Sequence, residues 1–208
     1  MKKVVVGVLV LAAAALAGAP QPIALPKPQT QGGMPLMQAL NQRRSGREFS
    51  GQKLSPQTLS NLLWAAFGIN RPDGRRTAPS ASNRQTIDIY VVTAEAAYLY
   101  NPKDQRLEPV ATGDFRAATG NQDFVSHAPV NLVFVSDYAK MAKTAAETQA
   151  LYAGAETGYI SQNVYLYCAS EGLVTVVRAT VDRAATAKAL GLRPDQKITL
   201  AQTVGYPK

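Results

Sequence analysis

The sequence predicts an α+β fold, an α/β/α sandwich in which helices flank a mixed central β-sheet. Segments with apolar residues at helical spacing alternate with short runs rich in β-branched residues, which is the pattern expected of helices packed on a sheet. The run from Val130 to Val135 is continuously apolar and suits a buried central strand. The chain has 208 residues, and residues 34–208 suffice for one domain with a sizeable core.

The N-terminus has the three parts of a secretory signal peptide. Lys2 and Lys3 precede an almost purely apolar run of 13 residues from Val4 to Leu16, and Ala17-Gly18-Ala19 supplies small residues for cleavage. A helix that anchors a protein in a membrane needs about 20 consecutive apolar residues, which is more than this run has. We therefore predict that residues 1–19 are removed near residue 19, without stable membrane insertion, and that the mature protein is periplasmic or secreted.

Residues 20–33 are rich in Pro, Gln and Gly and predict a flexible arm. Residues 34–208 form the expected domain, which opens with a helix ending near Arg44. A second helix is predicted from Pro56, because Ser55 suits the N-cap and Pro the first helical position, and Gly68 ends it.

The remaining elements follow from hydrophobic spacing and turn residues. After a polar loop at 71–83 we expect strands at 86–92, 97–100, 106–110, 130–135, 174–177 and 198–204, and helices at 114–118, 145–170 and 183–190. The strands at 97–100 and 106–110 form a hairpin, and Gly172 suits a glycine cap after the longest helix.

Charge favours anionic ligands. The formal net charge is +8, and loss of Lys2 and Lys3 leaves 20 basic against 14 acidic residues, or +6. The basic residues concentrate at 43–47 and 71–84 rather than along one helix face, so we predict no nucleic-acid partner.

Few residues are available for acid–base, metal or thiol chemistry. His127 is the only histidine and Cys168 the only cysteine, so zinc and a Ser-His-Asp triad are unsupported. We expect His127 to be structural and Cys168 to lie in the core as a small apolar residue. No glycine-rich dinucleotide or P-loop motif is present.

The segment Arg43-Arg44-Ser45-Gly46-Arg47 predicts a phosphate site. It places three guanidinium groups and a hydroxyl within five residues, at the end of an amphipathic helix. Guanidinium forks match phosphate oxygens, and the hydroxyl adds a donor. The alternative is a solvated basic turn.

A second loop, residues 76–85, carries short polar and amide side chains directly before a strand. Asn83 and Gln85 offer both donors and acceptors, as reading the edge of a polar heterocycle requires. The alternative is ordinary turn chemistry. Together the two segments suggest a ligand with a phosphate at one end and a heterocycle at the other.

The two segments also resemble motifs of the FMN-dependent nitroreductase family. The matching stretches are Arg-Arg-Ser-x-Arg-x-Phe at 43–49, Pro-Ser-x-x-Asn-x-Gln at 79–85, the helix from 158 to 166 running into Glu171-Gly172-Leu173, and Val-Gly-Tyr-Pro at 204–207. The segment at 62–68 is most similar to the branch of SagB-type dehydrogenases.

This resemblance implies a homodimer that shares two FMN sites, with the long helix in the dimer core. Arg43, Arg44, Ser45 and Arg47 would bind the phosphate, ribityl chain and pyrimidine edge. Pro79, Ser80, Ser82, Asn83 and Gln85 would approach the flavin from the partner chain, and backbone groups at Val176 and Val177 would lie beside the ring system. Arg178 stands near where the family often has glycine, so a charge there could alter the approach to the flavin.

The activity implied is a two-electron, ping-pong oxidoreductase. A reduced donor such as NAD(P)H would supply electrons to FMN, and a quinone, nitroaromatic or similar acceptor would remove them, with no side-chain acid or base required. The alternatives are a SagB-like dehydrogenase acting on azoline rings and a flavin-binding protein with little turnover.

Overall fold

A seven-stranded sheet organises residues 20–208, the part of the chain that the computed structural model describes. Its strands are β1 (Ile23–Ala24), β2 (Ile87–Val92), β3 (Ala96–Asn101), β4 (Arg106–Thr112), β5 (Val130–Asp137), β6 (Val174–Arg178) and β7 (Gln196–Gly205). The spatial order is β1-β4-β3-β2-β5-β7-β6. β6 therefore lies at one edge of the sheet and β1 at the other.

All pairings among these strands are antiparallel, so our prediction of a mixed sheet is wrong in strand direction. β7 inserts between β5 and β6 and runs antiparallel to both. Hydrophobic runs reveal that a strand is buried but not which way it runs. The predicted hairpin of β3 and β4 is confirmed.

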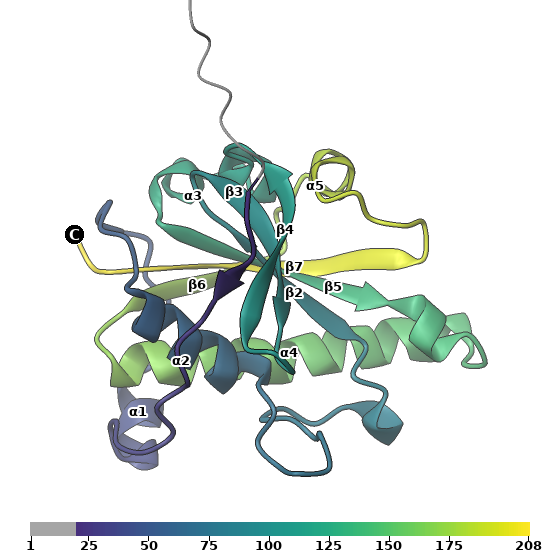
Figure 1. The fold of residues 1–208 in the computed structure, drawn as a ribbon, viewed down its shortest axis with the longest axis horizontal. Coiled ribbons are helices and arrows are strands. Elements are labelled where there is room, and N and C mark those ends of the chain that lie inside the picture. Colours follow the sequence, from purple (N-terminus) through teal and green to yellow (C-terminus); the bar gives the residue numbers. More distant parts are fainter. Residues whose placement is uncertain (1–19) are drawn as a thin grey trace, which may run out of the picture.

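Helices cover both faces of the sheet, which confirms the predicted sandwich and α+β class (Figure 1). The α-helices are α1 (Leu36–Gln42), α2 (Pro56–Phe67), α3 (Phe124–His127), α4 (Ala146–Ser170) and α5 (Arg183–Ala189). Short 3-10 turns are η1 (Ala81–Asn83), η2 (Arg116–Thr119) and η3 (Tyr138–Met141). The helices α2 and α4 pack on one face, while α5 and η2 lie over the other.

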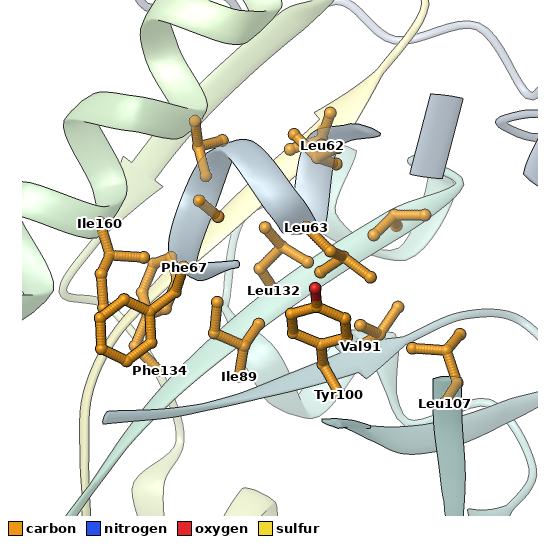
Figure 2. Close-up of a cluster of buried hydrophobic side chains, with 14 of the residues drawn as sticks. Leu62, Leu63, Phe67, Ile89, Val91, Tyr100, Leu107, Leu132, Phe134 and Ile160 are labelled. Atoms are coloured by element: carbon orange, nitrogen blue, oxygen red, sulfur yellow. The ribbon is translucent and has the colours of Figure 1, made fainter. Parts of the chain in front are cut away.

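The main core lies between the sheet and the pair α2 and α4. Leu63 and Phe67 of α2 meet Ile89 and Phe134 of the sheet, and Ile160 of α4 closes the cluster (Figure 2). These side chains are at most 2% exposed, so the pair of helices is fixed on the sheet. The burial follows the spacing of three or four residues along each helix.

The start of α2 and the end of α4 lie where the sequence predicts them, whereas the helix expected at 114–118 is the 3-10 turn η2 and α3 was not predicted. The Ser55 hydroxyl accepts a hydrogen bond from the Thr58 backbone N–H at 3.0 Å, and Pro56 is the first residue of α2. Gly172 follows α4 with φ 67°, a left-handed conformation that glycine adopts without a steric penalty. These caps fix the two helices on which the site below depends.

Residues 20–33 are docked on the domain, which corrects the expectation of a free, flexible arm. β1 pairs with β4, and the Leu25 side chain is 8% exposed. The Gln29 backbone N–H donates to Asn61 Oδ1 at 2.8 Å. Prolines excluded long elements from this segment but left room for a two-residue strand, which is too short for periodicity to predict.

The predicted signal peptide, residues 1–19, lies outside the described residues. Between residues 20 and 208 there is no helix whose length and apolar character would let it cross a membrane.

Cys168 lies in the main core, as predicted, and burial raises the pKa of its thiol. Because thiolate is the reactive form, we expect Cys168 to resist alkylation at pH 8 in the folded protein. The measurement is iodoacetamide labelling followed by mass spectrometry, with protein in 6 M guanidinium as the control that should label completely. Rapid labelling of the native protein would place the thiol outside the core.

Candidate functional site

The arginine segment runs along the outer edge of the sheet. α1 ends at Gln42, and Arg43 adopts an extended conformation that leads the chain away from the helix. The Gly46 N–H then donates to the Thr175 carbonyl of β6 at 3.0 Å. A Cβ at Gly46 would lie 2.6 Å from Val174 Cγ1, so this close approach requires glycine. The edge strand therefore holds the segment in place.

Tyr165 of α4 connects this segment to β6. Its hydroxyl lies 2.7 Å from the Ser45 hydroxyl, and the Val177 N–H donates to it at 3.0 Å. The Arg43 guanidinium stands over its ring, 5.2 Å from the centroid, within the range of a cation–π interaction. One side chain thus contacts two residues of the segment and the edge strand.

A cavity of about 520 Å³ adjoins the segment. Arg43, Arg44 and Gly46 line it on one side, Tyr165 on another, and Pro207 near the C-terminus. The volume falls within the range of small-molecule sites. Ser45 is exposed and lies outside the lining, so the structure brings its hydroxyl to Tyr165 rather than into the cavity wall.

The three guanidinium groups of Arg43, Arg44 and Arg47 have no carboxylate partner within residues 20–208. Other arginines of the chain, such as Arg116 and Arg193, do form ion pairs. Like charges gathered without counter-ions leave a positive field at this edge of the sheet. The segment can therefore hold an anion of more than one charge.

Val176 and Val177 lie on β6, the strand to which Gly46 is hydrogen-bonded, and they differ in their surroundings. The Val176 side chain is buried against Phe49 and Ala128. The Val177 N–H points away from β7 toward Tyr165. The backbone at Val177 is therefore the part of the strand that adjoins the site.

Arg178, which we expected to add a charge near the ligand, is instead buried beneath the sheet. Its guanidinium donates to Asn131 Oδ1 and Thr203 Oγ1, each at 3.0 Å, and to the Thr119 carbonyl. Burial lowers its pKa to about 10. A Cβ at Gly120 would lie 1.9 Å from Arg178 Nη1, so the neighbouring loop is shaped around this side chain.

The second predicted loop is built around a buried carboxylate, Glu156 of α4. Glu156 is 2% exposed, and Oε1 accepts from the Ser80 hydroxyl at 3.0 Å and the Ala81 N–H at 2.9 Å. Oε2 accepts from the Thr86 hydroxyl at 2.8 Å. These bonds fasten both ends of the loop to α4.

Three residues of this loop, Ser82, Asn83 and Gln85, have positive φ of 53°, 53° and 50°. This is the left-handed region of backbone conformations, which is strained for residues other than glycine and is kept only where the surrounding structure enforces it. The Gln85 side chain accepts from Arg76 Nε at 2.7 Å and donates to the Gly74 carbonyl, so it builds the loop. The Pro79, Ser82 and Asn83 side chains remain exposed.

The structure does not bring the two predicted segments together within one chain. Glu156 and Tyr165, which anchor them, are nine residues apart on α4, or roughly 14 Å along the helix axis. A ligand that contacts both segments therefore requires a second copy of the chain or another arrangement of the loop.

The sequence alone singled out neither Tyr165 nor Glu156 as part of the site. The signal for Glu156 was present, since it is a lone acid among small and apolar residues in the middle of the longest helix. The hydrogen bonds of Tyr165 join three segments distant in the chain, and no local pattern reveals such a junction.

A model of the nitroreductase family matches residues 40–206. The chain belongs to the nitroreductase family. It is therefore an oxidoreductase, and the matched range includes the arginine segment, the second loop and β6.

Individual relatives agree with this assignment. A protein of Methanocaldococcus jannaschii, provisionally named a nitroreductase, is 31% identical over 151 residues, which are 68% of this chain and 76% of the relative. A crystal structure from Ralstonia eutropha JMP134, also provisionally named a nitroreductase, is 41% identical with a TM-score of 0.88 and covers 93% of each chain. A nitroreductase-fold structure from Desulfovibrio desulfuricans, solved in complex with FMN, is 24% identical with a TM-score of 0.61, over 85% of this chain and 88% of that one.

Proposed function

We propose that this oxidoreductase is FMN-dependent and transfers two electrons in a ping-pong reaction. The reduced donor would be NAD(P)H or a similar reductant, and the acceptor a quinone, nitroaromatic or related small molecule. The observation that carries the proposal is a run of three arginines without a carboxylate partner in residues 20–208, two of which, Arg43 and Arg44, line the cavity next to β6. The FMN complex of the D. desulfuricans protein supports the choice of cofactor.

The residues present fit FMN. Arg43, Arg44 and Arg47 supply the charge for a phosphate dianion, and the exposed Ser45 hydroxyl adds a neutral donor. Bound FMN would supply the electron-transfer chemistry, as flavins do in enzymes that lack side-chain acids and bases. The chain's own part is to bind the phosphate, to orient the ligand against β6 and to present fixed donors.

We further propose that the working form is a homodimer and that the second loop completes the partner's site. The exposed surface of α4 carries Leu151 and Tyr159, which are 67% and 49% exposed, and the Met37 side chain of α1 is 76% exposed. Within residues 20–208, a Cβ at Gly154 or Gly158 would have no atom within 4 Å outside its own helix backbone, so both glycines leave room for another helix. Large apolar side chains in such positions are characteristic of an interface.

Sedimentation velocity at low micromolar concentration tests the dimer. We expect the mass of two chains, because apolar side chains on α1 and α4 are removed from water only by association. A monomer that binds FMN with full affinity would contradict the shared site.

Two alternatives to this function remain part of the proposal. The segment at 62–68, which is similar to SagB-type dehydrogenases, leaves an azoline dehydrogenase as an alternative, and a flavin-binding protein with little turnover is the other. Anaerobic stopped-flow reduction by NADH or NADPH, followed by reoxidation with a quinone, distinguishes an enzyme from a storage protein. We expect bleaching of flavin absorbance near 450 nm and its recovery with the quinone, whereas a storage protein would stay oxidised.

Export remains part of the proposal, on the strength of residues 1–19. The mature N-terminus should then lie between Gly18 and Gln21, and the apoprotein must take up FMN outside the cytoplasm. N-terminal sequencing of the protein from fractionated host cells tests this. Intact Met1 in a cytosolic fraction would overturn the export assignment and leave the flavin site unaffected.

A further inference from the structure

Tyr165 lies at the centre of a chain of hydrogen bonds that ends at the hydroxyl of an exposed residue, Ser45. The Val177 N–H donates to Tyr165 Oη at 3.0 Å, and Tyr165 Oη lies 2.7 Å from Ser45 Oγ. Within residues 20–208, Tyr165 Oη has only these two hydrogen-bond partners, and Ser45 Oγ has only Tyr165. Tyr165 is 7% exposed, whereas Ser45 is open to solvent.

The direction of this chain follows from the chemistry of its members. A backbone N–H only donates, so Tyr165 Oη accepts at that bond. The phenol proton then has one acceptor within reach, Ser45 Oγ. If Tyr165 donates to Ser45, the Ser45 proton is free to point outward. The reverse arrangement would leave the phenol proton of a largely buried group without an acceptor, which costs free energy.

We propose that Val177, Tyr165 and Ser45 form a directed hydrogen-bond relay that presents the Ser45 proton to the phosphate of FMN. Donors arranged in sequence polarise one another, so each O–H becomes a better donor than it would be alone. The relay ends at Ser45, which lies in the chain between Arg44 and Arg47, two arginines without a carboxylate partner in residues 20–208. Tyr165 is thus a positioning residue, and its role rests on the proposed FMN site.

The aromatic ring of Tyr165 also makes a cation–π contact with Arg43, and the substitution used in the experiment must preserve that contact. The ring carries the Arg43 guanidinium at 5.2 Å, and phenylalanine preserves this contact. Tyr165→Phe therefore removes the relay alone. Tyr167→Phe is the matched control, because Tyr167 is on the same helix and its hydroxyl donates to the Thr58 carbonyl, remote from Ser45.

The test is a double-mutant cycle read by flavin fluorescence titration of the full mature chain. We expect Tyr165→Phe to weaken FMN binding about 5- to 10-fold, since the Ser45 hydroxyl remains but is no longer oriented. Ser45→Ala should have a larger effect, and the double variant should match Ser45→Ala alone, because the relay acts only through that hydroxyl. Tyr167→Phe should bind FMN as the wild type does.

Riboflavin, which lacks the phosphate, separates the relay from a general structural effect. Its affinity should be the same for the wild type and Tyr165→Phe. Additive losses in the cycle, an unchanged FMN affinity in Tyr165→Phe, or an equal loss for riboflavin would each overturn the relay while leaving the FMN proposal standing. A wild-type protein that binds neither flavin would overturn both.

Discussion

Replacing Arg43 or Arg47 with alanine should weaken FMN binding by about 1.5–3 kcal/mol each, which is about 10- to 150-fold in the dissociation constant. Each substitution removes charge-assisted hydrogen bonds to the phosphate. Neither arginine has a carboxylate partner within residues 20–208, so the protein loses no ion pair of its own. The measurement is isothermal titration of the apoprotein with FMN.

Lys103→Ala is the control for loss of a positive charge. Lys103 is exposed in the turn between β3 and β4, outside the lining of the cavity. Its removal should leave FMN affinity within about twofold, because a distant exposed charge is screened by salt. Unfolding temperatures of the apoproteins should agree across all three variants. Wild-type affinity in both arginine variants would show that the segment is a solvated turn.

Glu156→Ala should lower the free energy of unfolding by about 3 kcal/mol or more. The substitution leaves the Ser80 hydroxyl, the Ala81 N–H and the Thr86 hydroxyl without their acceptor, and each buried unpaired donor costs about 1–3 kcal/mol. Without these bonds, Ser82, Asn83 and Gln85 are also no longer held in their left-handed backbone conformations. Urea denaturation measures the change in stability, and hydrogen exchange at residues 80–86 shows whether the loop loosens.

Glu147→Ala is the matched control on the same helix. Glu147 is exposed in the first turn of α4, where an acid contributes about 0.3–1 kcal/mol through the helix dipole. Equal losses for Glu147→Ala and Glu156→Ala would mean that the buried carboxylate does not hold the loop.

The fold followed from local patterns where these patterns were strong. Capping by Ser55 and Pro56, the long helix ending before Gly172, and the apolar run at β5 each predicted an element that the structure contains. Strand direction and the position of β7 between β5 and β6 did not follow, because they depend on how distant segments pair. β1 escaped prediction because two residues show no period.

The sequence predicts the charged residues of the candidate site but not the hydrogen bonds that connect its side chains. Three arginines within five residues are visible in the sequence, and two of them, Arg43 and Arg44, line a cavity in the structure. That Arg178 is buried against Asn131 and Thr203, rather than directed at a ligand, depends on register across three strands. The contacts of Tyr165 and Glu156 likewise arise only once α4 is packed against the sheet.

The most direct test of the FMN site is the cofactor content of the purified mature protein. Residues 20–208 should purify yellow or become yellow on addition of FMN, with absorbance bands of oxidised flavin, and the cofactor released by heat should have the mass of FMN. We expect one FMN per chain at saturation, since each chain carries one arginine segment. A colourless protein that takes up no added FMN, or one that releases FAD, would contradict the assignment of Arg43, Arg44, Ser45 and Arg47 to the phosphate of FMN.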